Sequence, residues 1–353
     1  MTAFLKPPFQ MIFYRFVVPD FVVPGPEQNM GAQTSSTSPP TTELTNEQVL
    51  SLHTVLSTVT EAPFATYWQT QPQLRLLAQG QWSRVIACGN DYVIKLEVDD
   101  RRVKDRPPAL LQAEWKRMQK CQGQSLVAQC IAAGTEEVDG IHYHYCIMPN
   151  YGPSLAFLYS RVFLPSAKAP TYYEKMKAAL TQLHDKGFLH RDVNSGNFLM
   201  QKTGQLVVID LGLAENNDPT VGCDTTGSPM FLSATLDENH LFTQQLVHDE
   251  VEDLEAMEYY YQGKRQDRHC PTRADDLEAA VFCAWSLTQR LPWESDDVAQ
   301  RVFKKRQLDG APEWVSTTVQ ALRAERIAEL AARQAQRAAE LLARQRRRLK
   351  RPQ

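Results

Sequence analysis

Two polar motifs separated by a predicted β-hairpin constrain this chain more than any other feature. The first motif is HRDVNSGN at residues 190–197, and the second starts at Asp210. Between them, the apolar runs 198–200 and 206–209 flank the turn residues Lys202-Thr203-Gly204, which is typical of two short strands and their connection. Because a hairpin brings its two ends together, the last residue of the first motif is expected beside the aspartate that opens the second.

Asp192, Asn197 and Asp210 are the side chains that phosphoryl transfer from a nucleotide requires. One carboxylate can orient an acceptor hydroxyl, while an amide and a second carboxylate can hold Mg²⁺ against phosphates. We expect Asp192 to take the first role and Asn197 and Asp210 to ligate the metal. A chance set of polar loop residues is the alternative. The order of the motifs, after a stretch with helical periodicity at residues 173–183, argues against chance.

The two motifs resemble the catalytic loop H-R-D-x-x-x-x-N and the D-F-G element of the protein kinase superfamily, with D-L-G at residues 210–212. The resemblance implies an α+β, bilobal fold with a small β-rich N-lobe and a mainly helical C-lobe. It also implies ATP and Mg²⁺ as cofactors and Asp192 as the catalytic base. Arg191 is expected to bind a phosphate or an acidic group of the activation segment, whose candidate hydroxyls are Thr220, Thr225, Thr226 and Ser228.

A lysine on an early predicted strand and a glutamate on the helix after it form the next candidate pair of site residues. Strands are predicted at residues 74–77, 83–88 and 92–96. Lys95, on the third strand, resembles the kinase lysine that holds the α- and β-phosphates. Residues 109–120 have helical composition and contain one acid, Glu114, so we expect Glu114 to pair with Lys95. The alternative is a solvated strand lysine.

Four further nucleotide contacts follow from the resemblance. Residues 78–85 resemble the glycine-rich loop, but only Gly80 and Val85 match its pattern outright. Residues 148–152 resemble the linker between the lobes, where the adenine edge meets backbone groups. Met148, the gatekeeper position, and Tyr151 are therefore expected to contact ATP together with Gly80 and Val85.

Two more strands are predicted, at residues 126–133 and 141–148. His142 and His144 would share one face of the second strand. Two histidines on one face can bind a metal, but no third ligand is evident in the sequence. We therefore interpret this face as polar and exposed.

Five segments narrow the resemblance to a divergent member of the casein kinase 1 group, which includes the vaccinia-related and tau-tubulin kinases. They are 94–97 (IKLE), 152–155 (GPSL), 210–214 (DLGLA), 275–278 (DDLE) and 291–293 (LPW). In that group a helix aspartate braces the catalytic loop, and here it corresponds to Asp276.

In the casein kinase 1 group S-I-N replaces the usual A-P-E element of kinases, and Ser233-Ala234-Thr235 lies where that element would be. Asn194 departs from the family pattern. It stands where serine/threonine kinases usually carry a lysine, which should weaken stabilisation of the transferring phosphate.

The domain organisation is expected as follows: a disordered Pro/Ser/Thr-rich lead at 1–44, a helical extension at 45–72, a kinase domain at 73–318 (N-lobe 73–148, C-lobe 149–318, acidic insertion 236–272), and a basic helix at 319–353. From Arg323 to the end the chain has ten basic and three acidic residues. Such a helix can be a solvated face, or it can bind nucleic acid or a nuclear import factor.

Composition excludes several classes of protein. Seven scattered cysteines, odd in number and without a C-x-x-C motif, argue against a disulfide framework and a zinc ribbon. The apolar runs 11–18 and 279–287 are too short to cross a membrane, and prolines interrupt the apolar amino terminus, so we expect no secretory signal. An intracellular protein, cytoplasmic or nuclear, is expected.

Three functions are compatible with these residues. The first is an ATP- and Mg²⁺-dependent serine/threonine kinase acting on proteins. The second is a pseudokinase that scaffolds partners with weak or no transfer activity, favoured by Asn194 and the reduced glycine loop. The third is a small-molecule phosphotransferase, which shares the H-x-D-x-x-x-x-N element but would not need residues 227–235 or the LPW segment.

Overall fold

The computed structural model describes residues 46–61, 64–79, 83–99, 110–138, 140–217, 227–236, 271–294, 297–308 and 310–349. The chain divides into two compact units. The first contains residues up to Val162 together with Ser195–Gly212, and the second contains Phe163–Asn194 together with residues from Leu213 onward. The predicted lead at 1–44, the activation-segment threonines and nearly all of the acidic insertion lie outside the described residues.

A five-stranded antiparallel sheet forms the body of the first unit, with strand order β1-β2-β3-β5-β4. The strands are β1 Leu74–Gln79, β2 Ser83–Cys88, β3 Tyr92–Asp99, β4 Ala132–Val138 and β5 Ile141–Pro149. The strands predicted at residues 83–88 and 92–96 are β2 and the first part of β3. Gly89 in the turn between them adopts φ 59°, a conformation that costs glycine little.

The strand predicted at residues 126–133 is wrong, because β4 starts only at Ala132. Val127 instead forms an isolated parallel bridge with Val208, in which Ala128 N–H donates to the Val208 carbonyl at 2.9 Å and Val208 N–H donates to that of Leu126 at 2.9 Å. The apolar run therefore reflects burial against another segment rather than membership of the sheet.

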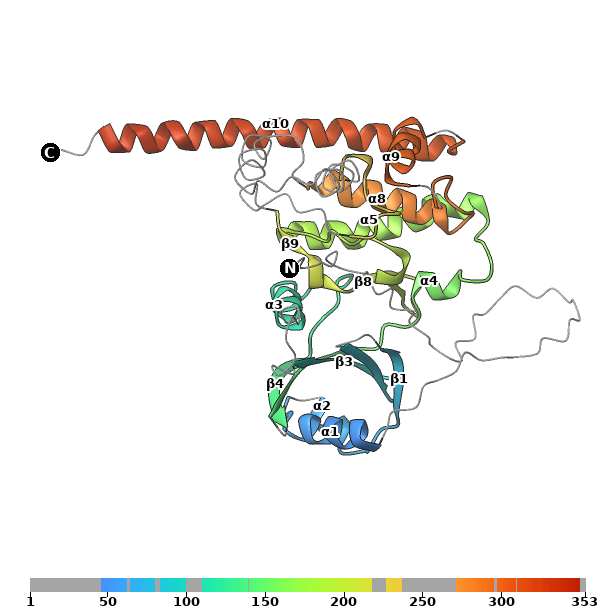
Figure 1. Cartoon of the computed structure of the whole chain (residues 1–353), viewed down its shortest axis with the longest axis vertical. Helices are drawn as coiled ribbons and strands as arrows, with labels where there is room; N and C mark the ends of the chain where they lie inside the picture. Colours follow the sequence, from blue (N-terminus) through green and yellow to red (C-terminus); the bar gives the residue numbers. More distant parts are fainter. Residues whose placement is uncertain are drawn as a thin grey trace, which may run out of the picture. The chain divides into compact units, whose positions relative to one another are not determined.

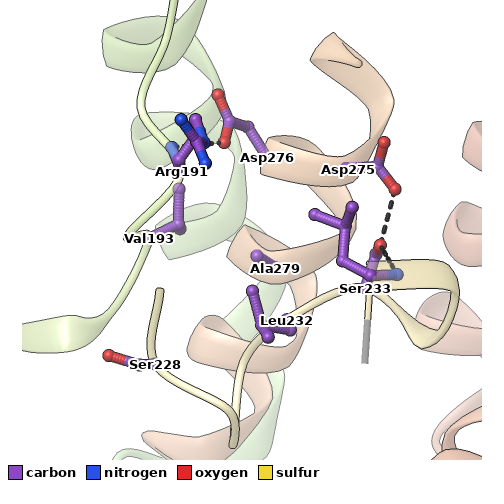
Figure 2. Close-up of a pocket in the computed structure, with 9 residues that line it drawn as sticks. Arg191, Val193, Ser228, Leu232, Ser233, Asp275, Asp276 and Ala279 are labelled. Atoms are coloured by element: carbon purple, nitrogen blue, oxygen red, sulfur yellow. Dashed lines mark hydrogen bonds between the residues drawn. The ribbon is translucent and has the colours of Figure 1, made fainter. Parts of the chain in front are cut away.

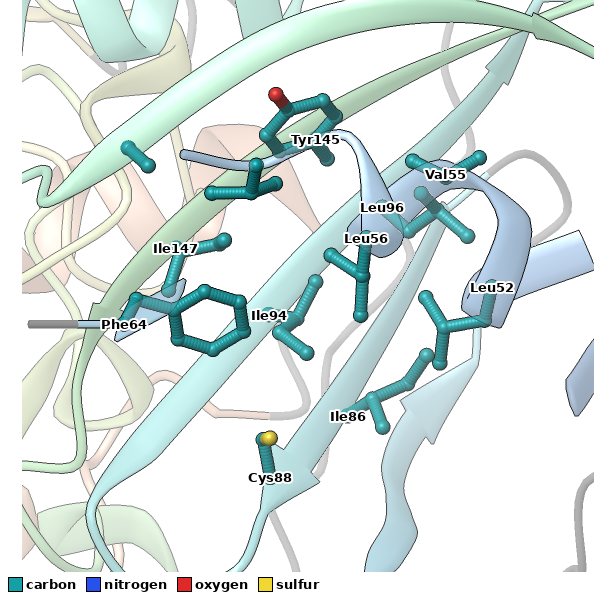
Figure 3. Packing of buried hydrophobic residues seen from close by; sticks show 12 residues of the cluster. Leu52, Val55, Leu56, Phe64, Ile86, Cys88, Ile94, Leu96, Tyr145 and Ile147 are labelled. Carbon is teal, nitrogen blue, oxygen red and sulfur yellow. The ribbon is translucent and has the colours of Figure 1, made fainter. Parts of the chain in front are cut away.

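Two short helices cover one face of this sheet, α1 Asn46–Ser57 and α2 Phe64–Trp68. Figure 1 shows both on the concave side of the curved sheet. Leu52, Leu56 and Phe64 pack there against strand residues that include Ile86 and Ile94, all fully or almost fully buried (Figure 3). The helix expected in the 45–72 extension is thus part of the sheet's core.

The opposite face of the sheet carries the alternate residues of the same strands, as the two-residue period of a strand requires. It includes Lys95, Cys146 and Met148, and the cross-strand register pairs Lys95 with Cys146. The helix predicted at residues 109–120 is α3 Leu111–Lys120. It contacts β3 and β5, with Met118 against Cys146 on this second face.

The exposed polar face predicted around His144 is wrong. His144 is 3% exposed. Its Nδ1 lies 2.8 Å from Thr135 Oγ1 and 3.1 Å from Gln112 Nε2, and its Nε2 lies 3.6 Å from the Asp99 carboxylate. No group of three or more His, Cys, Asp or Glu side chains among the described residues could hold a metal.

The first unit also contains the predicted hairpin. β7 Phe198–Met200 pairs antiparallel with β8 Leu206–Val208, and the short helix α4 Leu155–Leu158 lies against it. Gly152, before α4, has φ 109°, and an added Cβ would come within 2.5 Å of the Met200 carbonyl oxygen. Only glycine fits this close approach of two backbones.

The second unit is mainly helical. Its elements are η1 Ser166–Lys168, α5 Ala169–Asp185, α8 Arg273–Ser286, α9 Val298–Gln307 and α10 Glu313–Leu349, with the two-stranded pair β6 Phe188–Leu189 and β9 Glu215–Asn216. α8 is buried along nearly its whole length and contacts α5 and α10, as an apolar helix at the centre of a helical unit should.

The predicted basic C-terminal helix is α10, 37 residues long. Its first part packs inward through Val315, Val319 and Leu322, and its later part extends beyond α8 (Figure 1). No helix in the described part of the chain has the length and apolarity to cross a membrane. One unit rich in strands and one rich in helices agree with the predicted α+β class.

Candidate active site

Lys95 occupies the centre of the candidate site in the first unit. Its Nζ lies 2.7 Å from Glu114 Oε2 and 2.9 Å from Asp210 Oδ1. The predicted Lys95–Glu114 pair is therefore formed, although 19 residues separate the two in sequence, and the solvated-lysine alternative does not hold. Such a lysine is a fixed cation beside two acids, a suitable partner for phosphate oxygens.

Glu114 is the buried member of this cluster, with 2% exposure. Burial raises the pKa of Glu114 to about 7, and the Lys95 ammonium opposes that rise. A carboxyl group deprived of water favours its neutral form unless a cation compensates. The ion pair is thus sensitive to proton concentration near neutral pH.

The position of α3 is fixed at both of its ends. The Glu97 carboxylate accepts a hydrogen bond from Leu111 N–H at 2.8 Å, which places negative charge at the helix N-terminus. Near the C-terminus, Arg117 Nη1 donates to the carbonyl oxygens of Leu211 and Gly212 at 2.8 and 2.9 Å. The helix that carries Glu114 therefore also holds the D-L-G backbone.

The hairpin brings Asn197 and Asp210 together as predicted. Ile209 N–H donates to the Asn197 carbonyl at 3.0 Å, so Asn197 lies opposite the residue before Asp210. Asp210 has φ 61°, a left-handed conformation that costs a non-glycine residue energy and is often retained at functional sites. One amide and one carboxylate match the preference of Mg²⁺ for few protein oxygens plus phosphate oxygens, so this pair fits the expected metal.

The sheet face around Lys95 also carries the predicted adenine contacts. Val85 packs with Leu77 and Ala87 in a small apolar cluster, and Met148 lies opposite Val93 in the β3–β5 register. The Tyr151 hydroxyl accepts a hydrogen bond from Gln129 N–H at 2.8 Å. Gly80 lies outside the described residues.

The catalytic loop of the second unit is held by Asp276. Its carboxylate accepts hydrogen bonds from His190 N–H at 2.7 Å and Arg191 N–H at 3.0 Å, and it lies 2.8 Å from His184 Nε2. Burial raises the pKa of Asp276, but the hydrogen bond and charge of His184 and the charge of His190 outweigh burial, and the net effect lowers it. The expected bracing role of Asp276 is confirmed in its geometry.

Ser228 contacts the candidate catalytic base directly. Its N–H and hydroxyl donate to Asp192 Oδ1 at 2.9 and 2.8 Å. The Asn194 amide donates to the Asp192 carbonyl at 3.2 Å and to Ser228 Oγ at 3.3 Å. Asn194 therefore takes the place of a cation with a neutral hydrogen-bonding group, and the buried Ser228 hydroxyl is a poor candidate for phosphorylation.

Arg191 is paired with an acid of the segment that follows D-L-G. Its guanidinium is 4% exposed and forms an ion pair with Glu215, which lies opposite Leu189 in the β6–β9 pair. This ion pair is a contact of the kind that the resemblance implies for Arg191. Arg191 itself has φ 68°, and a Cβ added to Gly227 would lie 2.2 Å from the Arg191 carbonyl oxygen.

A polar network anchors residues 228–236 to three helices. Ser233 Oγ donates to Asp275 at 2.5 Å, and Arg326 of α10 donates to the same carboxylate at 3.1 Å. Lys305 of α9 is fully buried and donates to the Pro229 and Leu232 carbonyls at 2.7 and 2.9 Å. This network anchors the segment that stands in place of the A-P-E element.

Figure 2 shows Ser233, Asp275 and Asp276 around a small hollow between α8 and the catalytic loop. Its volume is about 10 Å³, close to the lower limit for one water molecule. The hollow is a packing gap lined by polar side chains and by Val193, Leu232, Leu236 and Ala279, and it is too small for a substrate.

Several site residues were not found by sequence reasoning. Arg117 could have been found, because it lies three positions after Glu114 and so on the same side of the helix. Glu215, Lys305 and Arg326 had no signal, since their partners are distant in sequence and belong to no predicted motif.

Comparisons with known proteins agree with this geometry. Residues 73–243 match the protein kinase domain. Human Rho-associated protein kinase 1 is 36% identical over 95 residues, covering 26% of this chain and 7% of that protein. Mitogen-activated protein kinase kinase kinase 1 of Arabidopsis thaliana is 29% identical over 201 residues, covering 53% and 32%.

A third relative is the rat serine/threonine-protein kinase STK11, 37% identical over 71 residues, which cover 19% of this chain and 16% of that protein. The chain thus matches only a minor part of each of these relatives. The match to the domain includes Lys95, Glu114, the catalytic loop and Asp210, the residues that the structure arranges in the two units. Residues 73–243, which include these site residues, are therefore similar to a protein kinase domain.

Proposed function

We propose that this protein is an ATP- and Mg²⁺-dependent kinase that transfers the γ-phosphate to serine and threonine hydroxyls of proteins. The observation that carries the proposal is Lys95 held between Glu114 and Asp210 at 2.7 and 2.9 Å. An ion pair with one partner 2% exposed is costly to keep unless it has a use, and placing phosphates is the use that fits these neighbours.

Each residue of the site has a role in this proposal. Lys95, fixed by Glu114, would position the α- and β-phosphates, and Asn197 and Asp210 would hold the metal. Bound Mg²⁺ would neutralise charge on the phosphate oxygens. Asp192 would orient the acceptor hydroxyl and take its proton, since its Oδ1 already accepts from a serine hydroxyl at 2.8 Å.

The preference for serine and threonine, and membership of the casein kinase 1 group, belong to the proposal. The name of one relative, serine/threonine-protein kinase STK11, supports the acceptor class. The casein kinase 1 group rests on the five short segments named above. The structure adds that the serine in place of A-P-E has a defined partner, Asp275.

A pseudokinase is the second candidate, and Asn194 favours it. The amide at this position donates to Asp192 and Ser228 and brings no positive charge to the transferring phosphate. Loss of one such charge slows transfer without abolishing nucleotide binding. The retained Lys95 cluster opposes a complete loss of activity.

Transfer of radiolabelled γ-phosphate from Mg-ATP tests the proposal. The acceptors are a peptide array with serine, threonine or tyrosine as the variable residue, and a panel of sugars and amines. We expect labelled serine and threonine peptides with wild type and none with Asp192→Asn, which should still bind ATP. No transfer by folded, ATP-binding wild type supports the scaffold, and labelled sugars or amines support the small-molecule alternative.

We further propose an intracellular location and a polyanionic partner, nucleic acid or an import factor, for α10. Exposed positions on its later part, including Leu342 at 55%, leave that part accessible, and its sequence is strongly basic. The full chain should bind labelled RNA or DNA, and this binding should weaken as salt increases. Loss of the binding on truncation after residue 340 would support the proposal. Equal binding by the truncated chain would refute it.

A further inference from the structure

Two cysteines lie in contact inside the first unit, beneath the Lys95 cluster. Cys130 precedes β4 and Cys146 lies on β5, and their sulfur atoms are 3.5 Å apart. Both thiols are free. Cys146 is fully buried, whereas Cys130 is 8% exposed, so a small reagent reaches the pair through Cys130.

The pair is connected to the candidate nucleotide site through two neighbours. Cys146 lies directly opposite Lys95 in the β3–β5 register, and its sulfur is 4.0 Å from that of Met118. Met118 is one helical turn from Glu114 on the buried side of α3. A displacement of the Cys146 sulfur therefore acts on β5, the strand paired with the Lys95 strand, and on α3, the helix that carries Glu114.

We propose that Cys130 and Cys146 are a peroxide-sensitive thiol pair whose disulfide displaces α3 and weakens nucleotide binding. A disulfide requires a sulfur–sulfur distance of about 2.05 Å, so the sulfurs must approach by roughly 1.5 Å from their present separation. The interior is close-packed, and Met118 must follow or lose contact. The effect on nucleotide binding rests on the function proposed above, whereas formation of the bond does not.

The chemistry balances with a peroxide as oxidant. The Cys130 thiolate attacks one peroxide oxygen, the O–O bond breaks, and the products are a sulfenic acid and, after proton uptake, water. The Cys146 sulfur then attacks the Cys130 sulfur and expels hydroxide, which takes up the thiol proton. Two thiols and one hydrogen peroxide give one disulfide and two waters, and a dithiol reductant reverses the change by exchange.

The acidity of the two thiols supports this order of attack. The Cys146 thiol donates to the Cys130 sulfur, which lowers the pKa of Cys130 although burial opposes it. The same hydrogen bond, together with burial, raises the pKa of Cys146. Cys130, the more exposed of the two, is therefore also the better nucleophile, as expected of a peroxide-reactive thiol.

Peptide mapping of the full-length protein tests the bond itself. The protein is treated with dilute hydrogen peroxide, free thiols are alkylated, and peptides are analysed without reduction. We expect a joined Cys130–Cys146 peptide lighter by about 2 Da than the two thiol peptides together, and its loss after dithiothreitol. Alkylation of both cysteines as free thiols after oxidation would overturn the proposal.

The consequence is measured by hydrogen exchange of residues 111–120 and by binding of a fluorescent ATP analogue. Oxidation should speed exchange in α3 and lower affinity in wild type, with recovery on reduction, and should do neither in Cys130→Ala or Cys146→Ala. Cys88→Ala is the matched control, because Cys88 is equally buried but lies on the other face of the sheet, and it should respond as wild type does.

If the oxidised disulfide forms but α3 exchange is unchanged, the proposed coupling is refuted. If reduced wild type binds no nucleotide, the proposed function fails while mapping and exchange still decide the thiol pair. Equal loss of binding in wild type and Cys130→Ala would assign the oxidation to another residue.

Discussion

The raised pKa of Glu114 gives a prediction with opposite effects on binding and on stability. Lys95 is positioned by ionised Glu114, and the pKa of that buried carboxyl is about 7. With this value the carboxyl is about 10% ionised near pH 6 and about 90% ionised near pH 8. If only the ionised form holds Lys95 for phosphates, the apparent affinity for ATP should rise about tenfold over this interval.

Stability should change in the other direction. A carboxyl whose pKa is higher in the folded state than in the unfolded state favours folding while it is protonated, and that contribution is lost as pH rises through the folded pKa. The unfolded reference for Glu114 is 4.5, so between about pH 6 and about pH 8 its contribution to the free energy of unfolding falls by about 1 kcal/mol.

Glu114→Gln is the variant that isolates both effects. Glutamine keeps the size of the side chain and an acceptor oxygen but does not titrate, so the ATP affinity of the variant should be low at every pH. The remaining pH dependence of that affinity should follow only the titration of the nucleotide's own phosphate, which also occurs in this range. Fluorescence titration with Mg-ATP and urea denaturation at each pH give the two quantities. Parallel curves for wild type and variant in both assays would refute the assignment.

Three further predictions concern the second unit. Gly227→Ala places a Cβ 2.2 Å from the Arg191 carbonyl oxygen, so it should lower the transfer rate at least about tenfold with ATP affinity unchanged. The control Gly140→Ala, at φ 74° with open space around the added Cβ, should not lower the rate. Equal transfer rates in the two variants would refute the steric argument. Ser228→Ala removes the hydroxyl donor to Asp192 and should lower kcat about tenfold with little effect on ATP binding; an unchanged kcat in phosphate transfer would contradict it. Lys305→Met leaves the Pro229 and Leu232 carbonyls without this donor, so the free energy of unfolding measured in urea should fall by about 2–4 kcal/mol. The control Lys304→Met, on the exposed side of the same helix, should lower it by less than about 1 kcal/mol.

Local sequence patterns were sufficient where a short segment determines its own structure. The β7–β8 hairpin, strands β2 and β3 and helix α3 all lie close to their predicted bounds, because turn residues, strand alternation and helical composition are local signals. Lys95 and Glu114 could be paired because the helix offered one acid.

Prediction failed where a distant segment decides the structure. Residues 126–131 are apolar because Val127 pairs with Val208, and a periodicity argument cannot distinguish such burial from a strand. The buried state of His144 depends on Gln112 of α3 and Thr135 of β4, neither of which is visible from alternation along β5.

Two residues of the candidate site have positive backbone φ angles, a feature that composition does not predict. Within the described residues of the matched span 73–243, the non-glycine residues with positive φ are Arg191 and Asp210, one in each unit. Each conformation costs of order 1–3 kcal/mol, and each is held by nearby bonds: Asp276 accepts from the Arg191 N–H, and Lys95 donates to the Asp210 carboxylate.

Backbone strain at Arg191 and Asp210 is worth keeping only if the direction of the nearby side chains matters. Asp210 is 26% exposed in its side chain, so simple burial does not explain its geometry. The left-handed turn instead points its carboxylate at Lys95, and the turn at Arg191 precedes Asp192, which would face the acceptor hydroxyl in the proposed function. The strained positions therefore coincide with the proposed catalytic groups because the same bonds that impose the strain also aim those groups.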